Sequence, residues 1–428
     1  MSRATARKCL APGTSVAPGE VLVATEVGDP AHGLLPCPAA PLLGGFLNRR
    51  GIRVRYGPVP RCADASQADD GAVLFVTSAL HADGGGTAIG AAASAVDGVG
   101  AAAARSAVEE WSAVVATRRL LGAVSPWCEG ARQALDRAAQ AVAAADGPVY
   151  ILGQLAATGQ ARAALAEAGA MFASDLAEVP DGAVVFVPAH GADPAVLAAA
   201  AARGLRVIDA TCPLVAGVQA EARHLAEHSD LVILIGQPGH SVVPAIAGQA
   251  AGKLIVAATP SRVGGAAANP RRVSYLVQPG IPVEDATPVM TALRSRFPGL
   301  HGPDPDRFCY AASDRAETVR AVAAACDVVL VLGDDSHPDT RQITALARGG
   351  RGKVHVVAEP GEIVPSWLAG AAAVGLADTV SASAGLAAQV AAALSGLGQL
   401  SVTERRVTTV ITGPSGGADT APVPAAGS

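Results

Sequence analysis

The chain has 428 residues, of which 50% are hydrophobic, 16% are charged and 3% are aromatic. This length is enough for roughly two to four compact units, and the apolar content predicts a large buried interior. The net charge of −5 excludes the basic footprint of a nucleic-acid-binding protein, and no apolar run reaches the roughly 18 residues that span a bilayer.

Cysteine usage and the N-terminal residues indicate the compartment. Seven cysteines, an odd number without close spacing, argue against a disulfide framework and favour a reducing environment. The first residues are basic, but no apolar stretch follows them, so they do not read as a secretory signal. We therefore expect a cytoplasmic protein without a membrane segment.

Residues 1–116 form an N-terminal extension whose pattern differs from the rest of the chain. Strands are expected at Val21–Glu26 and Ala72–Thr77, and a helix at Pro41–Arg49. The stretch His81–Gly100 is so rich in Gly and Ala that it predicts a mobile surface loop. A weaker alternative is a phosphate-binding loop at Gly84–Gly90.

From about residue 117 onward, β-branched segments alternate with alanine-rich segments, which is typical of βαβ units with a mostly parallel sheet. The expected strands are Pro148–Leu152, Ala183–Val187, Leu205–Asp209, Leu231–Ile235, Ser274–Val277, Val328–Leu332 and Lys353–Val357. The expected helices are Ala131–Ala144, Gln160–Ala168, Pro194–Ala202, Val215–Glu227, Pro288–Arg296, Ala316–Ala325, Arg341–Ala347 and Ala384–Leu394.

This alternation predicts three small α/β units after the extension. Their expected boundaries are 117–209, 210–306 and 307–399, and residues 400–428 are expected to hold a final strand and a disordered tail.

Three cysteines, Cys128, Cys212 and Cys309, stand where an expected strand gives way to a loop or helix. Three thiolates brought together from three units could hold an iron–sulfur cluster and leave one iron uncovered by protein. Taken singly, each could instead be a buried small apolar side chain. The other cysteines, Cys9, Cys37, Cys62 and Cys326, are interpreted as structural or surface thiols.

The residues around these cysteines carry a family resemblance. The stretches Trp127-Cys-Glu-Gly130, Asp209-Ala-Thr-Cys-Pro-Leu-Val215, Gly239-His240 and Cys309-Tyr-Ala311 follow one another in an order and at a spacing that resemble the LytB (IspH) family of 4-hydroxy-3-methylbut-2-enyl diphosphate reductases. The resemblance covers roughly residues 120–397. It implies an α/β fold in which three units surround a central 4Fe-4S or 3Fe-4S iron–sulfur cluster, with one cysteine from each unit as ligand.

The resemblance also implies an activity. Members of the family remove the allylic hydroxyl of a small diphosphate with two electrons, giving isopentenyl and dimethylallyl diphosphate in the methylerythritol phosphate pathway of isoprenoid biosynthesis. We therefore expect an iron–sulfur oxidoreductase that receives electrons from a ferredoxin- or flavodoxin-like partner, because nothing in the sequence resembles a complete flavin or nicotinamide site.

Four further residues match substrate-binding positions of the family: His190, His240, Gln278 and Ser381. Other positions depart from it. The glutamate that delivers protons in the family is replaced by Val242, and the phosphate loop reads His337-Pro-Asp339. An aspartate in that loop would repel a diphosphate unless a cation intervened. The catalytic residues are accordingly left unassigned.

Three functions remain open at this point. The chain could be a divergent reductase of the isoprenoid diphosphate, a protein that uses the same cluster on a substrate without a diphosphate, or a non-catalytic protein in which a cluster or zinc acts as a structural staple or redox sensor.

Overall fold

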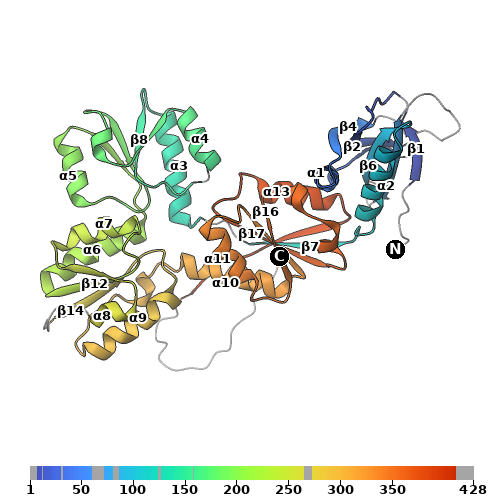
Figure 1. Cartoon of the computed structure of the whole chain (residues 1–428). Coiled ribbons are helices and arrows are strands. Elements are labelled where there is room, and N and C mark those ends of the chain that lie inside the picture. The colour runs from blue at the N-terminus through green and yellow to red at the C-terminus, as the bar shows by residue number, and fades with distance from the viewer. Residues whose placement is uncertain are drawn as a thin grey trace. The chain divides into compact units, whose positions relative to one another are not determined.

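The computed structural model describes residues 7–11, 13–29, 32–59, 72–80, 86–123, 127–157, 159–264 and 272–410 (Figure 1). The chain divides into two compact units. The first consists of Met1–Pro148, Leu155–Met171 and Arg315–Arg406, and the second of Val149–Gln154, Phe172–Asp314 and Val407–Ser428. Among the described residues, no helix combines the length and the apolar character that a membrane crossing requires.

The N-terminal extension forms a six-stranded sheet in the order β1-β5-β6-β2-β3, with β4 also paired to β2. All pairs are antiparallel except β2 with β4. The strands are β1 (Arg7–Ala11), β2 (Glu20–Asp29), β3 (Gly33–Pro36), β4 (Arg53–Val59), β5 (Ala72–Leu80) and β6 (Gly86–Ser94), and the helices are α1 (Ala40–Asn48) and α2 (Gly98–Ser112).

The prediction of a mobile loop at His81–Gly100 is wrong wherever these residues are described. Gly86–Ser94 is a strand between β5 and β2, and α2 begins at Gly98 after the N-cap Asp97, whose carboxylate accepts the amides of Val99 and Gly100. A Cβ at Gly90 would lie 3.2 Å from Val27 Cγ2. The small residues therefore permit close strand packing, and Gly86–Gly90 is not a phosphate loop. Residues 81–85 lie outside the described part.

The second sheet of the first unit is parallel throughout, in the order β16-β15-β17-β7-β18. All five residues of β15 are buried, as expected for a parallel strand covered on both faces. The elements are β7 (Arg118–Ala123), β15 (Val328–Leu332), β16 (Lys353–Val357), β17 (Ala373–Asp378), β18 (Leu400–Arg405), α10 (Ala311–Ala325), α11 (Pro338–Ala347), α12 (Pro365–Leu368) and α13 (Leu386–Ser395). Sequence patterning missed β7 and β17.

Strand β7 lies far in the sequence from the strands with which it pairs. Residues 118–123 open the segment expected as the first α/β unit, yet β7 pairs with β17 and β18. The tail residues 411–428 lie outside the described part.

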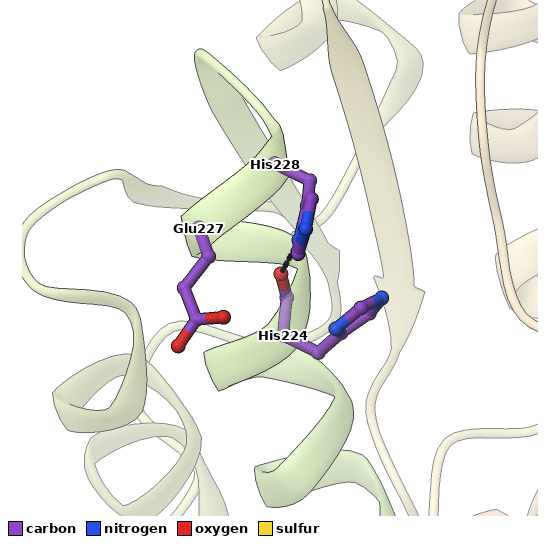
Figure 2. Close-up of side chains that lie close together, drawn as sticks. All are labelled: His224, Glu227 and His228. Carbon is purple, nitrogen blue, oxygen red and sulfur yellow. Dashed lines mark hydrogen bonds between the residues drawn. The ribbon is translucent and has the colours of Figure 1, made fainter.

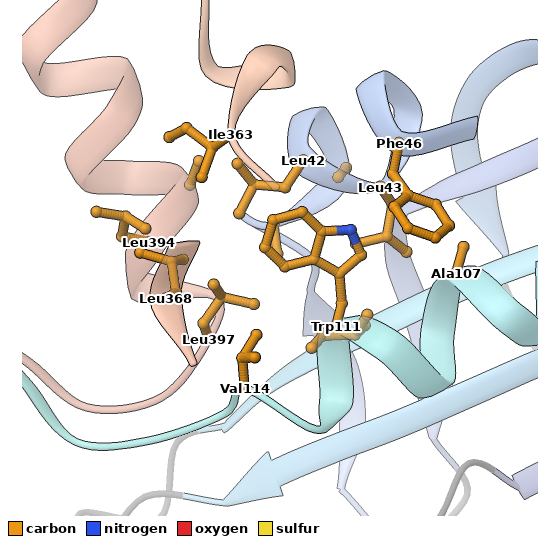
Figure 3. Packing of buried hydrophobic residues seen from close by; sticks show 14 of the residues in the cluster. Leu42, Leu43, Phe46, Ala107, Trp111, Val114, Ile363, Leu368, Leu394 and Leu397 are labelled. Atoms are coloured by element: carbon orange, nitrogen blue, oxygen red, sulfur yellow. The ribbon is translucent and has the colours of Figure 1, made fainter. Parts of the chain in front are cut away.

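A single buried cluster joins the extension to this parallel sheet within the first unit (Figure 3). Trp111 from α2 is fully buried and lies among Leu42 and Leu43 of α1 and Leu368 and Leu397 of the C-terminal part. The extension is therefore part of the first unit's core.

The second unit contains two small sheets whose recorded pairs are all parallel. The four-stranded sheet has the order β11-β10-β8-β9 and the three-stranded sheet the order β13-β12-β14. The strands are β8 (Val149–Leu152), β9 (Ala170–Ala173), β10 (Val184–Val187), β11 (Arg206–Asp209), β12 (Leu231–Ile235), β13 (Leu254–Ala257) and β14 (Val273–Val277). The remaining α-helices of the described residues are α3 (Glu129–Ala143), α4 (Gly159–Glu167), α5 (Pro194–Ala202), α6 (Pro213–His228), α7 (Val242–Ala247), α8 (Pro260–Gly264) and α9 (Val283–Arg296).

Candidate functional site

The three cysteines singled out in the sequence all stand at the start of a long helix. Cys128 is the N-cap of α3 and Cys212 the N-cap of α6, and neither thiol makes a capping hydrogen bond. Cys309 lies two residues before α10. Cys128 is exposed, Cys212 and Cys309 are partly buried, and none of the three is in a disulfide. The partial positive charge of a helix N-terminus favours anionic groups placed there, including thiolates and the clusters they hold.

The backbone around Cys212 is anchored to the neighbouring strand. Its amide donates to Ala189 O at 2.9 Å, just beyond the end of β10. The carboxylate of Asp209 accepts the amide of Thr211 at 2.8 Å, and Pro213 supplies a first helical residue that needs no donor. These contacts fix the turn that presents the thiol.

The segment that leads into Cys309 lies along α6 in the same unit. Arg307 pairs with Glu221 of α6 at 3.6 Å, and Phe308 and Leu214 line a shared cavity of about 150 Å³. Helix α6 thus begins with one of the three cysteines and contacts the segment that carries another. Cys128 belongs to the first unit.

The remaining described cysteines have a different chemistry. Burial, assisted by the charge of Glu26, raises the pKa of Cys37 to about 12, and burial, assisted by Asp327, raises that of Cys326 to about 11. Both stay protonated at neutral pH, as expected for structural thiols. Cys9 is disulfide-bonded, contrary to the expectation of a thiol, and Cys62 lies outside the described residues.

His190 and His240, both expected as substrate-binding residues, lie together in the second unit. Their ring centroids are 4.9 Å apart. His190 Nδ1 is 2.6 Å from Ser241 Oγ, and His240 Nδ1 accepts the amide of Val242. Burial, followed by the neighbouring His240, lowers the pKa of His190 to about 4, and burial lowers that of His240. At neutral pH the two imidazoles are therefore uncharged hydrogen-bonding groups.

This pair predicts a pH-dependent stability of the second unit. Because the folded-state pKa of His190 lies below the ordinary 6.5, its contribution is fully present above pH 6.5 and is lost as the pH falls towards 4. We expect a loss of about 3 kcal/mol across this window. Urea unfolding at several pH values should show this loss in the parent chain and a smaller loss in His190→Gln. An equal dependence of the unfolding free energy on pH in the two proteins would contradict the prediction.

His190 and Ser241 line a cavity of about 440 Å³ in the second unit. Its wall includes the ends of β8 and β10, at Gly153 and Pro188, and the first turn of α5. The carboxyl edge of a parallel sheet is the usual ligand-binding edge. The residues that line the cavity include Asp175 and Asp193 but no lysine or arginine, so an anion here would depend on neutral donors.

Gln278 is almost fully buried and supports the turn that leads to His240. Its Oε1 accepts the amide of Gln237 at 2.8 Å. A Cβ at Gly236 would lie 2.3 Å from the same oxygen, so this close contact requires glycine there. Gln278 thus positions the histidine turn.

Val242, which the resemblance places where the family has a glutamate, is fully buried. It packs with Val218, Leu234 and Ile246 in a cluster against which Cys212 also lies. A carboxylate at this position would enter an apolar environment, where its charged form is costly.

Ser381 belongs to a hydroxyl network at the edge of the parallel sheet of the first unit. Its Oγ accepts the amide of Asp334 at 2.9 Å and lies 2.8 Å from Thr340 Oγ1 and 2.9 Å from Thr379 Oγ1. Gly333, with φ +144°, passes so close that a Cβ would lie 2.4 Å from Ser381 Oγ.

Asp339, the acidic residue of the altered phosphate loop, is paired with Arg315. Two hydrogen bonds of 2.7 and 2.9 Å join them, and Asp339 also accepts the amide of Val380. Burial raises the pKa of Asp339, but the hydrogen bonds and charge of Arg315 outweigh it and leave the pKa below its usual value. Arg315 is therefore a cation that neutralises this aspartate in the fold.

The Arg315–Asp339 pair predicts a measurable loss of stability when one partner is removed. The two side chains are only 20% and 14% exposed, so Arg315→Leu should cost about 3 kcal/mol by leaving Asp339 uncompensated. The double variant with Asp339→Leu should recover part of that loss. Urea unfolding of the parent chain, of Arg315→Leu and of the double variant measures these free energies. A double variant less stable than Arg315→Leu would refute the prediction.

Sequence reasoning missed Ser241, which orients His190, and Asp378, the last residue of β17. Burial raises the pKa of Asp378, against the opposing effect of Arg315. A charged residue at the end of a buried strand was the available signal for Asp378, since such groups cluster at functional sites.

Parallel α/β units, cysteines outside any disulfide at helix starts and neutral histidines beside a cavity define a class of α/β protein with thiol groups able to bind a metal and with a separate ligand-binding cavity. Residues 120–395 match the family model described as LytB protein. The chain belongs to the LytB family, which confirms the resemblance seen in its motifs.

The relatives most similar in sequence include several that are named 4-hydroxy-3-methylbut-2-enyl diphosphate reductase. The chain is 37% identical over 297 residues to 4-hydroxy-3-methylbut-2-enyl diphosphate reductase 2 of Mycobacterium bovis, covering 68% of this chain and 90% of the relative. It is 35% identical over 289 residues to the reductase of Leifsonia xyli, covering 67% and 86%.

Two solved structures share the fold. One is the structure of (E)-4-hydroxy-3-methyl-but-2-enyl diphosphate reductase, the terminal enzyme of the non-mevalonate pathway. Its TM-score is 0.55 and its sequence identity 26%, and the match covers 65% of this chain and 99% of that structure's chain. The Plasmodium falciparum reductase has a TM-score of 0.58 and 21% identity over 67% and 92%. The α/β fold class is thereby confirmed.

Proposed function

We propose that this chain is an iron–sulfur oxidoreductase that converts (E)-4-hydroxy-3-methylbut-2-enyl diphosphate to isopentenyl and dimethylallyl diphosphate. The observation that carries the proposal is the match to the LytB family over residues 120–395, joined to cysteines outside any disulfide at the starts of α3, α6 and α10.

Cys128, Cys212 and Cys309 would hold the cluster. The donor set fits such a group: none of the three cysteines is in a disulfide, and each stands at or just before the positive end of a helix of 15 or 16 residues. Cys37 and Cys326 do not fit, because their raised pKa values keep them protonated. When bound, a 4Fe-4S or 3Fe-4S cluster supplies electrons and an open iron as Lewis acid.

The histidine pair would bind and orient the substrate through neutral hydrogen bonds. With a pKa of about 4, His190 carries no charge at neutral pH, and its contact with Ser241 Oγ fixes the ring. The hydroxyl network of Ser381, Thr340 and Thr379 would offer further neutral hydrogen-bond donors. Gln278 would act indirectly, by holding the turn before His240.

Protons must come from a group other than Val242. Asp378 is a candidate because burial raises its pKa, so it retains a proton more readily than an exposed carboxyl. Asp378→Asn should lower kcat more than it changes KM if the carboxyl moves a proton, whereas a purely structural role would not separate the two.

Turnover by anaerobically purified, cluster-loaded protein tests the proposed function. The assay supplies the isoprenoid diphosphate and a strong chemical reductant and measures the two five-carbon diphosphates. Electrons in the cell would come from a ferredoxin- or flavodoxin-like protein. Absence of product from protein with an intact cluster would refute the proposal.

The Arg315–Asp339 pair favours a second candidate, the same cluster acting on a substrate without a diphosphate. Asp339 occupies the altered phosphate loop, and its carboxylate neutralises Arg315. Arg315 is then not available to pair with an anionic ligand. Calorimetric binding of the isoprenoid diphosphate distinguishes the two, since tight binding would exclude this candidate.

A further inference from the structure

The C-terminal end of α6 carries three side chains that the proposed reductase reaction does not use. His224, Glu227 and His228 are all exposed, and one ligand atom from each lies within 4.8 Å of the others. Figure 2 shows the three side chains leaving the last turns of the same helix.

Their spacing places them on neighbouring positions of the helix surface. His224 and His228 are four residues apart and His224 and Glu227 three apart, the two separations that bring helical side chains together. The two rings already lie with centroids 4.5 Å apart. Two imidazoles and one carboxylate are a donor set that suits Zn²⁺ and the neighbouring divalent transition metals.

One of the imidazoles is already oriented for a metal. His228 Nδ1 lies 2.8 Å from the backbone oxygen of His224, and Figure 2 marks this hydrogen bond. Because a carbonyl oxygen only accepts, Nδ1 is the donor, and in the neutral ring Nε2 is the nitrogen with a lone pair for a metal. A backbone carbonyl that binds the second ring nitrogen is a common support of metal-ligating histidine.

The local electrostatics also favour a cation. α6 ends at His228, so the partial negative charge of the helix C-terminus lies at this position. Glu227 adds a full negative charge. Exposed side chains can rotate to bring their donors to the roughly 2.0–2.2 Å that zinc requires.

We propose that His224, Glu227 and His228 form a surface site for one divalent transition-metal ion of the zinc class, with water completing the coordination. The site is independent of the cluster cysteines. α6 has 16 residues and is therefore about 24 Å long, and Cys212 lies at its opposite end. Exposure of all three ligands makes this a binding site without an enclosing pocket for a substrate.

Titration of the cluster-loaded full chain with Co²⁺, followed by displacement with Zn²⁺, tests the proposal. The visible spectrum separates the ligand types, because thiolate-bound Co²⁺ gives an intense charge-transfer band and imidazole-bound Co²⁺ does not. We expect one metal ion per chain without that band. The double variant His224→Ala/His228→Ala should lose affinity by more than the roughly tenfold that loss of a mere supporting partner costs.

The matched control is His301→Ala, which removes an exposed histidine outside α6 and should bind Co²⁺ as the parent does. Glu227→Gln should weaken binding less than the double variant. Unchanged affinity in the double variant, a thiolate band that grows with the bound metal, or no binding by the parent would each overturn the proposal. None of these readouts depends on reductase turnover.

Discussion

Cys212→Ala is expected to purify without its iron–sulfur cluster and without reductase activity. Iron content should fall from about three to four per chain, the count of a 3Fe-4S or 4Fe-4S cluster, to near zero. Cys212 makes no capping hydrogen bond, so the alanine variant should keep the fold. Iron and sulfide analysis with visible and EPR spectra of anaerobically purified protein gives the measurement, and far-ultraviolet circular dichroism confirms folding.

The matched control for this variant is Cys326→Ala. Cys326 is buried among apolar side chains and its thiol stays protonated, so this variant should retain all its iron. A Cys212→Ala protein with full iron content would remove Cys212 from the ligand set. Equal loss in both variants would show that iron depends on general stability.

Trp111→Ala is expected to destabilise the first unit by about 4 kcal/mol, the usual cost of truncating a large core aromatic side chain. Trp111 is fully buried where the N-terminal extension meets the parallel sheet (Figure 3). Urea unfolding followed by circular dichroism measures the change. A shift below about 1 kcal/mol, the range of ordinary substitutions, would mean that the extension folds separately from that sheet.

Trp111→Phe provides the comparison for this test. The indole Nε1 is buried with no hydrogen-bond partner in the described part of the chain, which is a cost in the folded state. Phenylalanine removes that unpaired donor while keeping most of the apolar volume. We therefore expect Trp111→Phe to cost much less than Trp111→Ala.

The extension also shows where composition misleads. The run of Gly and Ala at 86–94 has little apolar bulk, so it predicts a mobile loop. In the fold the same small residues form a strand between β5 and β2, where Gly90 lies against Val27. Small side chains are compatible with either outcome, and only the neighbouring strands decide between them.

The sequence predicted some features of the candidate site and not others. Cys128, Cys212 and Cys309 each stand at or just before the start of a helix, which local sequence indicates, but Cys309 follows the 3-10 turn Pro305–Arg307 and not the strand that the sequence led us to expect. The contact of His190 with Ser241, 51 residues away, was not predictable. The support that Gln278 gives to Gln237, 41 residues away, is of the same kind.

The sequence by itself determined the α/β class and the family, because hydrophobic periodicity and short motifs are local properties of the chain. Its assignment of Cys128, Cys212 and Cys309 as cluster ligands stays a prediction. Only the tertiary structure decided that β7 pairs with β17 and β18, that the extension shares the core of the first unit and that Asp339 is neutralised by Arg315. Each of these depends on residues far apart in sequence, whose meeting is set by the packing of whole elements and whose charge states are set by the burial that results.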